Sequence, residues 1–184
     1  MILPIVGYGH QVLRSKAVEI GADYPGLSEL IENMFETMYN AQGVGLAAPQ
    51  INLPIRLFVV DGTPMDDEEM QGFKRVFINA KKLEENGKPW GFEEGCLSIP
   101  DIREMVRRRS DITLNYFDEN FEEKTETFSG MKARVIQHEY DHTEGILFMD
   151  HISHLRRSIL KPRLQKIIRG DIEVEYPMKF NRKV

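Results

Sequence analysis

Two histidines four residues apart, with a glutamate beside the first, are the side chains of this sequence best arranged to do chemistry. They are His138, Glu139 and His142, within the stretch QHEYDH. Residues four apart share one face of an α-helix, so both imidazoles could bind one metal ion. The glutamate, about 100° round the helix, could take a proton from metal-bound water. Gln137 and Asp141 could orient such ligands or lie on the surface. The same string also arises by chance on solvated helix faces, so both interpretations stay open.

A catalytic metal site usually has three protein ligands and one open position, so a third ligand is needed. His151 and His154 follow His142 by nine and twelve residues and fall outside the helical spacing, which favours satisfied or exposed side chains for both. Cys96 is the better candidate, because a thiolate binds zinc or ferrous iron strongly. The alternative is that Cys96 is a small buried hydrophobe, the common state of a free cysteine.

Helices are predicted where apolar residues recur at spacings of three and four. One such stretch is at about 27–41, with Ser28 as the N-cap, and another at about 130–143, which carries the two histidines. A third helical pattern over 154–170 contains Pro162, which should kink or break the helix.

Strands are predicted at about 55–60 and 75–85, the second followed by an Asn-Gly turn at 86–87. Alternating apolar and polar residues predict a hairpin over 110–130 and a short strand over 171–177. Runs of strands flanked by separated helices indicate an α+β fold with a mainly antiparallel sheet.

Composition and charge limit the class of protein. The chain has 184 residues, 41% of them apolar and 29% charged, which is typical of one globular domain. Its net charge of −5 argues against a nucleic-acid-binding protein held by bulk charge. The single cysteine excludes a disulfide-stapled secreted domain. The first residues lack the features of a signal peptide, and no segment approaches the roughly 20 apolar residues that span a bilayer, so the cytoplasm is the expected compartment.

The chain carries three motifs in a fixed order: GVGLAAPQ (43–50), EGCLS (94–98) and QHEYDH (137–142). Together they resemble the signature motifs of the peptide deformylase family, and the resemblance extends from the first residues to about 150. It implies an α+β fold in which mainly antiparallel β-sheets pack around a central metal-binding helix, with an N-terminal and a C-terminal helix. It also implies that residues 1–184 form a single catalytic domain.

Position by position, the resemblance implies a metal centre and the groups around it. The three metal ligands would be Cys96, His138 and His142. Glu139 would be the general acid and base. The side-chain amide of Gln50 and the backbone N–H of Leu97 would donate to the oxyanion that develops on the substrate.

Side chains close to the motifs are candidates for contact with the substrate. Gly45 would let the backbone approach the substrate closely. The apolar candidates for a methionine pocket are Val44, Ile99 and Val135, each of which could instead be ordinary core. Glu94 and Arg103 could frame the pocket or contact the peptide backbone, or could form a surface salt bridge.

The activity that the resemblance implies is removal of the N-terminal formyl group from formyl-methionyl nascent polypeptides, with release of formate. Metal-bound water would be the nucleophile. The cofactor would be one Fe²⁺ per chain, for which Zn²⁺, Ni²⁺ or Co²⁺ can substitute. Besides the nascent peptide, the expected partner is the ribosome near its exit tunnel, through the basic stretch 155–169, with neither DNA nor a membrane as a partner. The expected location is the cytoplasm of a bacterium.

Three other functions stay open from the residues alone. The chain could be a general metallopeptidase that cuts internal peptide bonds. It could be a thiol enzyme with Cys96 as the nucleophile and a histidine as the base. It could also be a metal-binding module without catalytic activity.

Overall fold

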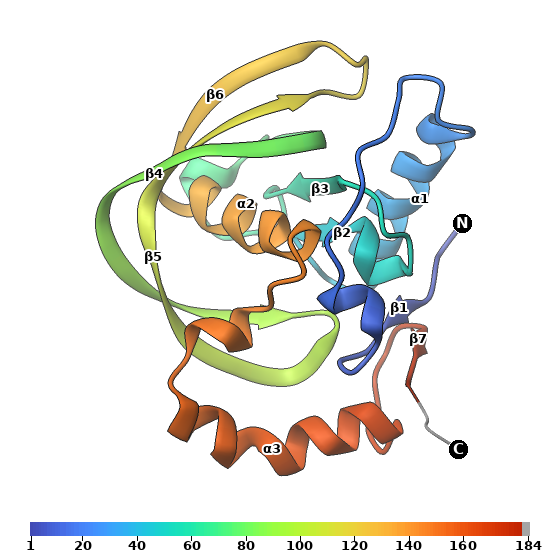
Figure 1. Ribbon diagram of the computed structural model, residues 1–184, viewed down its shortest axis with the longest axis vertical. Helices are drawn as coiled ribbons and strands as arrows, with labels where there is room; N and C mark the ends of the chain where they lie inside the picture. The colour runs from blue at the N-terminus through green and yellow to red at the C-terminus, as the bar shows by residue number, and fades with distance from the viewer. Residues whose placement is uncertain (182–184) are drawn as a thin grey trace.

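An antiparallel sheet of five strands curves around one helix, α2, which spans Gly130–Thr143 (Figure 1). The computed structural model describes residues 1–181. The strands lie in the order β2-β3-β4-β5-β6. Their bounds are Gly45–Ala47, Leu57–Asp61, Lys74–Cys96, Ile99–Phe117 and Glu123–Ser129. The predicted α+β class is confirmed, with α2 in the central position expected for the helix that carries the histidines.

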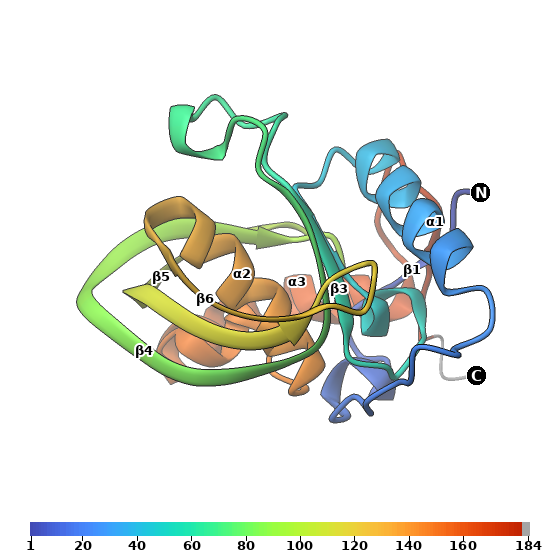
Figure 2. The ribbon, with the colours of Figure 1, turned by 90° about the horizontal axis from the view of Figure 1, so that it is seen from above.

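The two long strands β4 and β5 form a bent hairpin that wraps past α2 (Figure 2). The predicted turn at 86–87 is wrong, because β4 continues through it to Cys96. The pairing shifts register between Asn86 and Pro89, and Gly87 has a φ of 76°. A bulge and a tight turn both favour a residue with positive φ, so an Asn-Gly pair does not distinguish them, and the long-range pairing with β5 decides.

The predicted hairpin is formed by the second half of β5 and by β6. Asp111 pairs with Ser129 and Phe117 with Glu123, and the connection lies between Phe117 and Glu123. The alternation has its expected cause: the apolar residues of one face are buried against α2, namely Ile112, Leu114 and Tyr116.

Helix α1 spans Leu27–Asn40. Its apolar face packs against the sheet at β3, where Leu57 and Val59 belong to the same core cluster. The prediction that Ser28 is the N-cap is wrong: the N-cap lies two residues earlier, at Gly26, which has a φ of 69°. A left-handed residue at this position favours glycine, and the backbone N–H of Leu30 bonds to the Gly26 carbonyl. Ser28 therefore lies in the first turn.

Helix α3 spans His154–Arg169 and continues through Pro162, so of the predicted kink or break the break does not occur. Proline removes the hydrogen bond to the carbonyl of Ser158 four residues earlier. Both residues are exposed, so that carbonyl faces water rather than an apolar core. Buried apolar side chains on both sides of the proline, Leu160 and Leu164, hold the helix on the protein.

The predicted strand over 171–177 is also wrong. Its side chains do alternate, with Ile172, Val174 and Tyr176 half-buried, but the segment pairs with no strand among the described residues. The last strand, β7 (Met178–Lys179), follows it and pairs in parallel with β1 (Ile5–Val6). The C-terminal segment is therefore fastened to the start of the chain.

Four 3₁₀ helices complete the described elements: Gln11–Arg14, Ala48–Ile51, Glu68–Met70 and Phe148–His151. Helix α2 is buried almost all round although it carries many polar residues. These buried polar residues are Arg134, Gln137, Glu139, Asp141, His142 and Thr143. Since buried polar groups are normally paired or functional, the centre of the molecule is where its chemistry should lie. Within residues 1–181, no helix has the length and apolarity to cross a membrane.

Candidate active site and metal centre

Cys96, His138 and His142 come together at the centre of the molecule. Their ligand atoms all lie within 4.8 Å of one another, and Cys96 Sγ is 3.4 Å from Nε2 of His142. Ligand atoms around a tetrahedral metal with bonds of 2.0–2.3 Å lie about 3.5 Å apart. One thiolate and two imidazoles are donors that zinc and ferrous iron accept. The three residues therefore fit a metal ion in both geometry and donor chemistry.

The position of Cys96 follows from an irregularity at the end of the β4–β5 hairpin. The pairing shifts register between Gly95 and Cys96, and Cys96 faces Ile99 across the two-residue connection Leu97-Ser98. The register shift takes the thiol out of the regular alternation of β4. The strand therefore ends with its sulfur directed at the helix that carries the two histidines.

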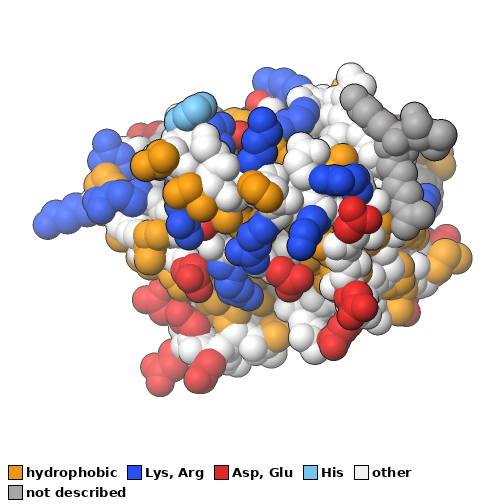
Figure 3. All heavy atoms as spheres, turned by 90° about the horizontal axis from the view of Figure 1, so that it is seen from below, with side chains coloured by type: hydrophobic (Ala, Val, Ile, Leu, Met, Phe, Trp, Pro, Cys, Tyr) orange, Lys and Arg blue, Asp and Glu red, His pale blue; other side chains and the backbone are white. Residues whose placement is uncertain are grey.

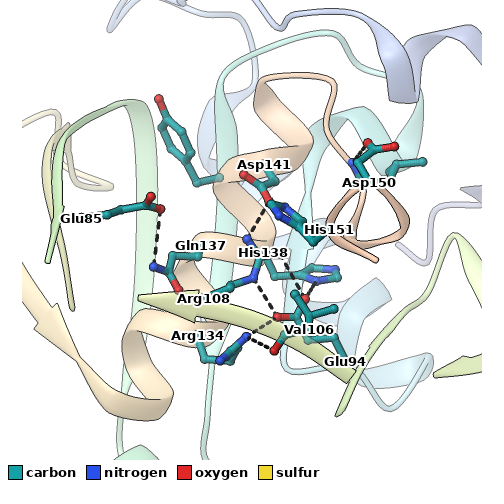
Figure 4. A network of polar contacts seen from close by, with 12 residues as sticks. Glu85, Glu94, Val106, Arg108, Arg134, Gln137, His138, Asp141, Asp150 and His151 are labelled. Atoms are coloured by element: carbon teal, nitrogen blue, oxygen red, sulfur yellow. Dashed lines mark hydrogen bonds and ion pairs between the residues drawn. The ribbon is translucent and has the colours of Figure 1, made fainter. Parts of the chain in front are cut away.

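Glu94 fixes the orientation of His138 (Figure 4). Its Oε2 lies 3.0 Å from Nδ1 of His138, which leaves Nε2 of that ring for a metal. Its Oε1 accepts hydrogen bonds from Arg108 Nε at 2.7 Å and from Arg134 Nη1 at 2.9 Å. Burial by itself raises the pKa of Glu94, but the hydrogen bonds from His138 and Arg108 outweigh it and hold the pKa well below its ordinary value.

The same network continues along α2 to the surface. Arg108 Nη1 bonds to Asp141 Oδ2 at 2.7 Å, and Asp141 Oδ2 lies 2.8 Å from Nε2 of His151 (Figure 4). His151 is thus a satisfied histidine, as expected. Gln137 is buried and donates to the carbonyl of Arg109 at 3.1 Å, so it is not a surface residue. Among the described residues, neither Gln137 nor Asp141 bonds to a candidate ligand, and it is Glu94 that orients one of them, His138.

The electrostatics of the two histidines differ. Burial lowers the pKa of His142 well below its ordinary value, so the imidazole is neutral and its lone pair is available. Burial also acts to lower the pKa of His138, but the neighbouring Cys96 and Glu94 raise it well above its ordinary value. A thiol and a carboxylate thus favour positive charge at this point, which is what a divalent cation supplies.

Glu139 lies against the backbone of Gly45. A Cβ added to Gly45 would stand 2.4 Å from Oε1 of Glu139, so only glycine leaves room for the carboxyl group. Its other oxygen, Oε2, is buried and has no hydrogen-bond partner among the described residues. Burial raises the pKa of Glu139 to about 7, so the group can both take up and release a proton near neutral pH.

Gln50 and Leu97 lie on the other side of the thiol. The side-chain oxygen of Gln50 accepts the N–H of Ala47 at 2.9 Å, which turns its amide nitrogen toward Cys96 Sγ at 3.5 Å and Ser98 Oγ at 3.3 Å. Leu97 is half-buried in the β4–β5 connection. Both residues therefore border the space in front of the candidate metal ligands.

A cavity of about 860 Å³ opens in front of these groups. Residues singled out in the sequence that line it are Val44, Gly45, Gln50, Glu94, Cys96, Leu97, Ile99, Arg103, Val135, His138 and Glu139. His142 is buried behind this surface. Glu94 is buried with its carboxylate oxygens engaged, whereas Arg103 is exposed at the rim and forms no ion pair with any described residue.

Several residues of the cavity were not identified from the sequence. They include Met65, Phe92, Met131, Arg134 and the C-terminal stretch 173–176. Arg134 stacks on Trp90, with its guanidinium carbon 4.4 Å from the ring centroid. These residues carry no local motif, and only the three-dimensional fold brings them to the cavity.

Comparison with known proteins gives one consistent result. The family model described as polypeptide deformylase matches residues 2–158. The peptide deformylase of Christiangramia forsetii is 56% identical over 98% of this chain and 96% of its own, and that of Salinibacter ruber is 46% identical over 97% and 94%. The crystal structure of a peptide deformylase from Legionella pneumophila superposes with a TM-score of 0.81 at 36% identity, covering 93% of this chain and 98% of that one.

Fold and site together define a hydrolase of the metalloenzyme class, with a cysteine and two histidines able to bind the metal. The chain belongs to the polypeptide deformylase family. The family predicted from the three motifs is therefore confirmed.

Proposed function

We propose that this chain removes the N-terminal formyl group from formyl-methionyl nascent polypeptides and releases formate. One observation supports this most directly. Glu139, whose buried Oε2 has no hydrogen-bond partner among the described residues, lines the same cavity as Cys96 and His138, within a chain of the deformylase family. Hydrolysis of a formamide needs a polarised water, a proton carrier and donors for the oxyanion, and the residues of this cavity can supply all three.

Cys96, His138 and His142 would hold the metal, and we propose Fe²⁺, with Zn²⁺, Ni²⁺ or Co²⁺ able to replace it. When bound, the ion would supply Lewis-acid chemistry and would lower the pKa of the water that attacks the formyl carbon. A thiolate and two neutral imidazoles leave a divalent site with one net positive charge. Glu94 keeps the ring of His138 in the orientation that ligation needs.

Glu139 is the proposed general base and acid. As a carboxylate it accepts the proton of the attacking water, and as a carboxylic acid it passes that proton to the leaving amine nitrogen. The carboxyl can serve in both directions because burial raises its pKa to about 7. Gly45 supports this role, since any larger residue would occupy the space of the carboxyl.

Gln50 and Leu97 are the proposed donors to the formyl oxygen as negative charge develops on it. The amide nitrogen of Gln50 is held in direction by its own oxygen, which is bonded to the N–H of Ala47. The second donor is the backbone N–H of Leu97, so it does not depend on the side chain at that position. A donor fixed before the reaction contributes typically about 2.7–4 kcal/mol to the barrier reduction.

Val44, Ile99 and Val135 are the proposed walls for the methionine side chain, and all three line the cavity. Arg103, exposed at the rim, is free to contact the carbonyl groups of the peptide. Glu94 lines the cavity too, but we assign it to positioning of His138 because its oxygens are already bonded there.

We also propose that residues 1–184 form one catalytic domain, although the last three residues lie outside the part of the chain that the structure describes. The proposed location is the bacterial cytoplasm, where a metal-binding thiol stays reduced. Neither DNA nor a membrane is among the proposed partners.

We further propose that α3 contacts ribosomal RNA near the exit tunnel. Lysine and arginine side chains gather across the face on which α3 lies (Figure 3). Those that α3 exposes are Arg156, Arg157, Lys161, Arg163, Lys166 and Arg169. Replacing Arg157, Lys161 and Lys166 by glutamine should reduce the amount of protein that co-sediments with ribosomes. It should also make the remaining binding less sensitive to salt. Unchanged co-sedimentation would contradict this part of the proposal.

The activity itself is tested by formate release from formyl-Met-Ala-Ser, with anaerobic metal analysis of the same sample. The proposal expects formate release that is lost on chelation and restored by Fe²⁺, together with loss of metal in Cys96→Ser. Cleavage of the unformylated peptide would indicate a general metallopeptidase. Activity that survives chelation but not alkylation would indicate a thiol enzyme.

A further inference from the structure

The C-terminal segment 173–176 forms part of the cavity wall although it lies beyond the end of the family match at residue 158. It reaches the cavity because β7 pairs with β1 and because the N–H of Ile5 bonds to the carbonyl of Pro177 at 2.9 Å. Figure 1 shows this last part of the chain returning from α3 to lie beside β1. The segment is thus held where it ends, directly before β7.

Within this segment, Tyr176 contacts the connection that contains Leu97. Its hydroxyl donates to the carbonyl oxygen of Leu97 at 2.8 Å. Both side chains are partly buried and pack on the same core cluster. Burial raises the pKa of the Tyr176 hydroxyl above its ordinary value, so the group stays protonated and remains a donor throughout the working pH range.

The connection Leu97-Ser98 is held by two further bonds. The N–H of Tyr8 donates to the carbonyl of Ser98 at 2.8 Å, and the Gln50 amide donates to Ser98 Oγ at 3.3 Å. These bonds fix Ser98, whereas the bond from Tyr176 is made to Leu97 itself. The N–H and the carbonyl of Leu97 are separated by a single Cα, so fixing one restricts the direction of the other.

We propose that Tyr176 is a positioning residue that, by holding the Leu97 carbonyl, aims the Leu97 N–H at the formyl oxygen of the substrate. This inference rests on the proposed function, because it needs Leu97 to be an oxyanion donor. It assigns the C-terminal segment a role in the reaction rather than in fold stability alone. The ring of tyrosine would pack equally well without its hydroxyl, so the hydroxyl is the group to test.

The test is Tyr176→Phe, compared with Tyr24→Phe, since Tyr24 packs on the same core cluster but lies outside the cavity. On formyl-Met-Ala-Ser, Tyr176→Phe should lower kcat by about tenfold and leave KM within about twofold, because the bond matters where charge develops on the formyl oxygen. Its thermal midpoint and metal content should match those of Tyr24→Phe. p-Aminophenylalanine at position 176 keeps a donor in the same place and should recover most of kcat.

The inference is overturned if Tyr176→Phe keeps the kcat of the wild type, or if kcat falls but p-aminophenylalanine does not restore it. A loss of kcat that follows a drop in thermal midpoint or metal content also overturns it, since the role would then be structural. Failure of the proposed function looks different: the wild type itself would release no formate.

Discussion

At the scale of the residue, the decisive feature is a carboxyl group that is buried without a hydrogen-bond partner in the described residues. Burying such a group costs stability, so its presence points to a function for the carboxyl. Glu139→Gln keeps the shape but cannot carry a proton, so kcat for formate release should fall by at least about 100-fold. Anaerobic metal analysis should find the same metal content as in the wild type.

Glu119→Gln is the matched control for that variant, because Glu119 is exposed on the β5–β6 connection. It should leave kcat unchanged. A Glu139→Gln protein that binds metal and still releases formate at the wild-type rate would remove Glu139 from the mechanism.

Gly45 gives a second prediction at this scale. In Gly45→Ala the new Cβ would meet Oε1 of Glu139 at 2.4 Å, so the carboxyl must move. Displacement of a reacting group by about 1 Å costs roughly 100-fold in rate, and a loss of kcat of that order is expected. Gly91→Ala serves as the comparison, since its Cβ would meet only the flexible end of Met105 at 2.9 Å. Equal activity of the two variants would show that the close approach at Gly45 is not used.

At the scale of the element, the β5–β6 connection depends on one carboxylate. Asp118 Oδ1 accepts the N–H groups of Asn120 at 2.9 Å and Glu122 at 3.0 Å, and Oδ2 pairs with Lys124 at 2.6 Å. The hydrogen bond from Lys124 and those from the two backbone groups lower the pKa of Asp118 below its ordinary value of 3.8. Because Asp118→Ala leaves the N–H groups of Asn120 and Glu122 without this acceptor, it should lower the free energy of unfolding by about 1–2 kcal/mol near pH 7.

The pH dependence of this effect has a definite sign. The folded-state pKa lies below the unfolded-state value, so the carboxylate stabilises the fold fully above 3.8 and loses that effect as the pH falls through the lowered folded pKa. The difference in the free energy of unfolding between wild type and Asp118→Ala, measured with urea, should become smaller when the pH is taken well below 3.8. Glu119→Ala, in the same connection, should show no such pH-dependent difference.

Elements whose pattern is local could be predicted from the sequence. The positions of α1 and α2 and the hairpin ending at Ser129 follow from periodicity, which neighbouring residues determine. The course of β4 through 86–87 could not, because a bulge and a turn need the same backbone angles and only the distant β5 distinguishes them. The segment 171–177 alternates because one side faces the protein, but it lacks a strand partner among the described residues.

The candidate site also contains residues that could be predicted from the sequence and residues that could not. Cys96 and the two histidines lie in recognisable motifs, so they could be identified from the sequence. The orienting role of Glu94 could not be predicted, because its partners Arg108, Arg134 and His138 lie 14, 40 and 44 residues away. Tyr176 lies 79 residues from Leu97 and is brought to it only by the pairing of β7 with β1.

At the scale of the whole molecule, Glu94 connects the sheet and helix α2 with the candidate metal centre. Through Arg108 and Arg134 it links β4 to β5 and α2, and it also bonds to His138, one of the three candidate metal ligands. Glu94→Gln removes the charge that two buried guanidinium groups share. Breaking a buried ion pair costs about 3–5 kcal/mol, so the free energy of unfolding of the metal-free protein should fall by roughly 3 kcal/mol.

Glu104 is the matched control, since it faces Glu94 across the β4–β5 pair and bonds instead to Arg156, whose side chain is 51% exposed. Glu104→Gln should cost less than about 1 kcal/mol in urea unfolding. Glu94→Gln should also weaken metal binding by about 10- to 100-fold, because His138 loses the acceptor that orients it, whereas Glu104→Gln should not. If both variants lose equal stability and keep equal metal affinity, then the buried network does not couple the sheet to the metal centre.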